Sequence, residues 1–192
     1  MIAAGPRLSG GVLALLLGAL GGCDRGEAPA GPVPDAPVST VPAAVSLSAR
    51  CSLDTPLEPG VPGSPGHLLP SDINPNGQSE LAALMRAMQA HMSETRERLT
   101  SGRELGPAPE EQARIRCAWP TTPSDRNPTF DAFAVAYLDA LEALHRPGTR
   151  DEQVQRYEGV VKACLACHAQ SCTGPMAAIE QLHIVPTPPV TP

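Results

Sequence analysis

The chain has 192 residues, of which 42% are hydrophobic and only 3% are aromatic, and its formal net charge is −6. That length suits one domain with an irregular extension. The acidic balance argues against a nucleic-acid partner, because nucleic-acid binding needs a positively charged surface. The 23 prolines are concentrated between residues 29 and 75 and in the last seven positions, so the packed domain is expected to lie between those two regions.

Residues 1–22 are expected to be a lipoprotein signal peptide. An apolar run over residues 12–20 is too short to span a bilayer and is typical of a signal sequence. It ends in Leu20-Gly21-Gly22-Cys23, which resembles a bacterial lipobox. The resemblance implies cleavage before Cys23 and lipidation of its sulfur, the alternative being ordinary signal cleavage nearby. We therefore expect an exported protein, lipid-anchored at the periplasmic face of a bacterial membrane. Asp24 slightly favours the inner membrane.

After Cys23, the segment up to residue 77 is rich in Pro, Ala, Gly and Val and shows no sustained apolar period. Such a composition indicates an extended tether rather than a packed element. We expect the last part of this segment, from Cys51, to pack on the domain. Pro75-Asn76-Gly77 predicts a turn at its end.

Residues 78–183 show helical spacing of apolar residues, and no segment alternates with a period of two, so no sheet is expected. The prediction is an all-α domain, an antiparallel four-helix bundle. Thr149 and Glu152 form a capping box for the last long helix. A short helix is expected after Pro175, and residues 184–192 are predicted to be a disordered tail. The four predicted helices cover about residues 78–100, 109–118, 129–145 and from 149 onward.

The strongest motif is Cys164-Leu165-Ala166-Cys167-His168. The CxxCH pattern indicates covalent attachment of one c-type haem. On a helix, residues three and four apart share a face, so the two sulfurs and the imidazole project together. Cys164 and Cys167 would form thioethers with the haem, and His168 would be the proximal iron ligand. The haem is therefore expected near the end of the last helix of the bundle.

Three cysteines remain once Cys23 is assigned to lipid and two others to haem: Cys51, Cys117 and Cys172. An odd number in an oxidising compartment predicts one disulfide and one free thiol. Their spacing alone does not say which two pair.

Four helices with CxxCH near the end of the last resemble class II c-type cytochromes, the cytochrome c′ and cytochrome c556 group, over residues 78–172. Class I cytochromes c carry the motif near their N-terminus instead. In the c556 subgroup, a methionine in a Leu-Met-Lys or Leu-Met-Arg context early in the first helix is the sixth iron ligand. Leu84-Met85-Arg86 matches that context, so the resemblance implies Met85 as the sixth ligand, with Met88 as the second choice.

The resemblance implies an electron-transfer protein rather than an enzyme. Its partners would be a redox protein of unknown identity and, through the anchor, the membrane; a homodimer stays open. One alternative is a five-coordinate cytochrome c′-like protein that binds NO or CO. Another is a haem-free copper- or zinc-binding lipoprotein, because Met85, Met88, His91 and Met92 supply soft ligands on one helix. A further alternative is thioredoxin-like thiol exchange at Cys164 and Cys167, but the sequence lacks the βαβ pattern in which such a pair usually occurs.

Overall fold

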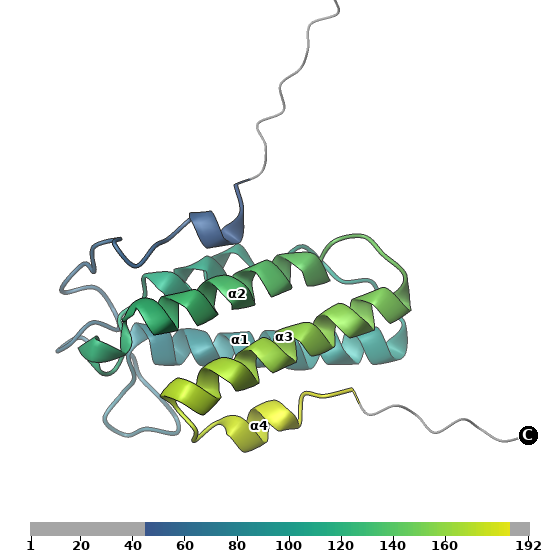
Figure 1. The fold of residues 1–192 in the computed structure, drawn as a ribbon. Helices are drawn as coiled ribbons and strands as arrows, with labels where there is room; N and C mark the ends of the chain where they lie inside the picture. Colours follow the sequence, from purple (N-terminus) through teal and green to yellow (C-terminus); the bar gives the residue numbers. More distant parts are fainter. Residues whose placement is uncertain (1–44, 185–192) are drawn as a thin grey trace, which may run out of the picture. The chain divides into compact units, whose positions relative to one another are not determined.

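The computed structural model describes residues 45–184, in which the regular secondary structure consists of helices joined by loops, with no strand (Figure 1). The all-α prediction is confirmed. The predicted signal peptide, Cys23 and residues 185–192 lie outside the described residues. Within them, no helix is long and apolar enough to cross a membrane. The α-helices are α1 (Glu80–Ser101), α2 (Pro128–Leu144), α3 (Arg150–Ser171) and α4 (Met176–Glu180), and the 3-10 helices are η1 (Leu47–Ala49), η2 (Glu110–Arg116) and η3 (Pro123–Asp125).

Side-chain caps set where the long helices begin. Ser79 Oγ accepts the Ala82 N–H at the start of α1, at 3.2 Å. At the start of α3, the predicted capping box of Thr149 and Glu152 is present. Gly102 ends α1 with a φ of 73°, a left-handed conformation that glycine adopts without steric cost. Each cap satisfies backbone groups that a helix end would otherwise leave unpaired.

The second predicted helix is not an α-helix. Its place is taken by η2, a 3-10 helix of seven residues that contacts both α1 and α2. Pro109 precedes it directly, and Pro120 follows closely. Short 3-10 helices are common as connections between longer helices.

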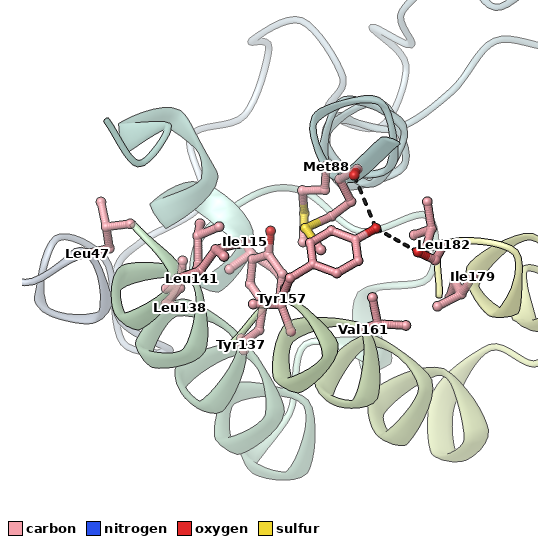
Figure 2. Close-up of a cluster of buried hydrophobic side chains, with 14 of the residues drawn as sticks. Leu47, Met88, Ile115, Tyr137, Leu138, Leu141, Tyr157, Val161, Ile179 and Leu182 are labelled. Atoms are coloured by element: carbon pink, nitrogen blue, oxygen red, sulfur yellow. Dashed lines mark hydrogen bonds between the residues drawn. The ribbon is translucent and has the colours of Figure 1, made fainter. Parts of the chain in front are cut away.

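The core lies between α1, α2, α3 and α4. α3 packs mainly along α2, and α4 lies beside α3 (Figure 1). Tyr157 is fully buried at the centre, and its hydroxyl lies 3.2 Å from the Met92 carbonyl and 2.8 Å from that of Leu182 (Figure 2). This hydroxyl connects α3 with α1 and with the segment after α4. Ile179 on α4 and Leu182, which follows this helix, are both buried.

The described part of the predicted tether, residues 45–77, packs on the helices. Leu47 is 4% exposed and belongs to the core. Arg116 pairs with Asp131 at 2.7 Å and also donates to the Cys51 carbonyl at 2.8 Å. Packing on the helices was expected from Cys51, and it begins slightly earlier, by Leu47. Side-chain donors and a disulfide make much of this packing, rather than a helical stripe of apolar residues.

The disulfide left open by the sequence joins Cys51 and Cys117, whose Cα atoms are 5.8 Å apart. It links the segment before α1 to the end of η2. Cys172 is a free, exposed cysteine.

A stacked histidine pair lies between α1 and the end of α2. The ring centroids of His91 and His145 are 5.4 Å apart. His145 Nδ1 donates to the Gly106 carbonyl at 2.7 Å, and its Nε2 is buried without a partner. Burial lowers the pKa of both histidines below the ordinary value, and His145 further lowers the pKa of His91. Both rings are therefore uncharged at neutral pH.

Because of this histidine pair, we expect acid to destabilise the fold. The nearby charged groups are Glu94 and Arg98 on α1 and Glu111 on η2; the two carboxylates partly offset the pKa decrease at His91. Because the folded pKa values lie below the unfolded value of about 6.5, the unfolded chain binds more protons. The contribution of the two histidines to the free energy of unfolding is therefore fully present above that pKa and decreases as the pH falls below it. Urea unfolding between about pH 8 and pH 5 measures this decrease.

The variant His91→Gln/His145→Asn is expected to flatten that pH dependence, because it removes both titrating rings. An amide at position 145 can still donate to Gly106 O. His67 is exposed in a loop, so His67→Asn is the matched control and should keep the wild-type profile. An unchanged profile in the double variant would rule out the pair as its cause.

Candidate haem site

The three residues of the pentad that are predicted to hold haem lie in the last two turns of α3. Cys164, Cys167 and His168 are partly exposed, whereas Val160 and Val161, one turn earlier, are fully buried. Helical spacing places the sulfurs and the imidazole on one face, as predicted. Val160 and Val161 anchor that face against the core.

The same three side chains line a cavity with Met85 and Met88 of α1. The cavity volume is about 30 Å³, which is room for about one water molecule. Its lining exposes much more apolar than polar surface. The tertiary structure therefore brings the motif of α3 and the predicted ligand region of α1 to one apolar site. The remaining lining residues are Ile115, Phe133, Ala134, Tyr137 and Ala163.

The two motif thiols have pKa values above the ordinary value for cysteine. Burial raises the pKa of Cys164 to about 12, with a further contribution from the neighbouring Cys167. Burial also raises the pKa of Cys167, and Cys172 adds to that increase. Both groups are therefore protonated at neutral pH. Since the thiolate is the form that attacks disulfides, this environment disfavours thiol exchange.

His168 has a defined hydrogen bond. Its Nδ1 lies 2.8 Å from the Cys172 carbonyl oxygen. A carbonyl only accepts, so Nδ1 carries a proton, and in the neutral imidazole Nε2 then keeps its lone pair. An imidazole held this way can bind a metal through Nε2.

The four soft residues predicted on α1 separate in the structure. Met85 and Met88 line the cavity, whereas His91 stacks on His145. Met92 is 1% exposed in the core. In the part of the chain from residue 45 to 184, no three His, Cys, Asp or Glu side chains gather as a metal-binding group.

Tyr137 and Gln112 form a polar pair beside the cavity that sequence reasoning missed. The Tyr137 hydroxyl donates to Gln112 Oε1, and the two residues are 3% and 1% exposed. Burial raises the pKa of Tyr137 well above its usual value, so the phenol stays protonated as a donor. The apolar spacing of α2 indicated that Tyr137 is buried. No sequence signal indicated Gln112, which directly follows two glutamates.

Comparisons of the chain with protein-family models, curated proteins and solved structures gave no match. The case for a cofactor therefore rests on the residues themselves. The residues suit haem in two ways. The two thiols suit its covalent attachment, and the imidazole with a free Nε2 and the two thioethers suit ligation of its iron. The apolar lining suits a macrocycle. Because the cavity is small, seating a haem requires movement of partly exposed lining side chains such as Met85 and Phe133.

Proposed function

We propose that this protein is a membrane-tethered mono-haem c-type cytochrome that carries electrons and is not an enzyme. The observation that carries the proposal is the shared cavity, where the CxxCH residues of α3 meet Met85 and Met88 of α1. The predicted lipobox at Cys23 supports a lipid anchor at the periplasmic face of a bacterial membrane, with the inner membrane favoured. A separate redox protein would be the partner.

Each residue at the cavity has a distinct task in this proposal. Cys164 and Cys167 hold the haem through thioether bonds, His168 binds the iron through Nε2, and Met85 binds from α1. Bound haem supplies a one-electron couple. A neutral imidazole and a neutral thioether raise its reduction potential. Phe133 and the buried Tyr137 exclude water from the site.

The bundle fold is part of the same proposal. α1, α2 and α3 would be three of its helices, and η2, which contacts both α1 and α2, would take the place of the second. In such a bundle the start of α1 would lie beside the end of α3, as the resemblance to class II cytochromes implies.

A second candidate is a five-coordinate haem protein that binds NO or CO. Met88 belongs to the hydrophobic core and Met85 packs against it, which favours this candidate because methionines often serve only to fill space. In that case neither methionine binds the iron.

Optical spectra of the protein produced with haem-attachment machinery distinguish the two functions. The oxidised wild type is expected to be low-spin, with the weak far-red band of a methionine–iron bond. Met85→Leu should remove that band and give a high-spin spectrum, because leucine conserves volume but has no sulfur.

Met88→Leu is the matched control, since both methionines line the cavity, and its spectrum should remain low-spin. If Met88→Leu alone loses the band, Met88 is the ligand instead. A high-spin wild type that shifts on adding CO or NO would support the gas-binding function. Wild-type protein without covalent haem would rule out both the electron-transfer and the gas-binding function.

A further inference from the structure

His168 and Cys172 are connected twice at the end of α3. The His168 ring donates from Nδ1 to the Cys172 carbonyl at 2.8 Å. In the other direction, the Cys172 N–H donates to the His168 carbonyl at 3.1 Å. The two hydrogen bonds thus hold the backbone of residues 168–172 and the His168 imidazole together at the end of the helix.

The ring bond depends on how the chain leaves the helix. Side chains of an α-helix lean toward its N-terminus, so a histidine does not ordinarily reach the carbonyl four residues after it. Cys172 caps α3 with a φ of −157° and a ψ of 90°, an extended conformation. This conformation takes its carbonyl out of the helical direction and within reach of the His168 ring.

We propose that the Cys172 peptide carbonyl positions His168 as the axial ligand and tunes the haem potential. This inference rests on the proposed function. The bond fixes the tautomer with Nε2 free, and it sets the plane of the ring. Hydrogen bonding from Nδ1 makes a ligating imidazole more electron-rich. A more electron-rich ligand stabilises the oxidised iron, so the bond lowers the reduction potential that Met85 ligation raises.

The side chain of Cys172 is not needed for this role, which allows a matched pair of variants. Cys172→Ala removes the exposed thiol and keeps the backbone. Cys172→Pro removes the N–H and holds φ near −65°, far from the observed −157°, so it moves the carbonyl. Proline is common just after helix ends, and residue 172 is exposed. Circular dichroism verifies that both variants keep the helical fold.

The first readout uses haem-free protein, in which ¹⁵N NMR reports which ring nitrogen of His168 carries the proton. In the wild type and Cys172→Ala, the proton is expected on Nδ1. In Cys172→Pro, the signal should shift toward the Nε2-protonated form. A proton on Nε2 in the wild type would overturn the hydrogen bond.

The second readout uses haem-loaded protein. Relative to Cys172→Ala, Cys172→Pro should show a more positive reduction potential. In the Met85→Leu background, where the reduced iron has lost its sixth ligand, Cys172→Pro should also show a lower iron–histidine stretching frequency than Cys172→Ala. Equal values in the two variants would overturn the tuning role while leaving the cytochrome proposal intact. A wild type that takes up no covalent haem would overturn the cytochrome proposal and this role together.

Discussion

Replacing both Cys164 and Cys167 by serine is expected to abolish covalent haem. A serine hydroxyl does not form the thioether bond by which c-type haem is held, and the two cysteines belong to the one CxxCH motif in the chain. The measurement is the pyridine haemochrome spectrum of denatured protein after the polypeptide has been separated from free haem. The signal that stays with the wild-type polypeptide should disappear in the double variant.

Cys172→Ser is the control for that experiment, because it removes a free thiol next to the motif and leaves the backbone carbonyl in place. It should retain covalent haem at the wild-type level. Haem that remained with the denatured double variant would show attachment elsewhere, and the role given to the pentad would then be wrong.

Replacing both Cys51 and Cys117 by alanine is expected to lower the free energy of unfolding by about 4 kcal/mol, in the chain-entropy description of a cross-link. The disulfide closes a loop with a sequence separation of 66, so its loss gives the unfolded chain many more conformations. It also frees the segment before α1 from η2. Urea denaturation of wild type and variant measures the difference.

Two comparisons make that result specific. Cys172→Ala should leave stability unchanged, since this cysteine is exposed and unbonded. Neither Cys51 nor Cys117 lines the cavity of the pentad, so the haem spectrum of the folded double variant should match the wild type. A stability loss below about 1 kcal/mol would mean that non-covalent packing, such as that of Leu47, already holds the segment.

Prediction of the fold succeeded where the signals were local. The capping box at Thr149 and the apolar spacing of residues 129–145 located α3 and α2 closely, because caps and helical periodicity act within a few residues. At η2 the predicted helix is present but is a 3-10 helix. Packing of the segment before α1 was expected from Cys51 and begins slightly earlier, by Leu47. The contacts of Arg116 with Cys51 and Asp131 join distant segments, and no local pattern encodes them.

For the site, the sequence by itself determined the CxxCH face, because three residues within one helical turn need no partner to stand together. It also singled out Met85 and Met88, through a resemblance that stays a prediction. Only the tertiary structure decided that these methionines share an apolar cavity with the motif, while His91 and Met92 do not. It also decided that Cys51 pairs with Cys117 and that the Tyr137 hydroxyl reaches Gln112. The physical reason is range: helix spacing depends on neighbours along the chain, whereas cavities and cross-links depend on how distant segments pack.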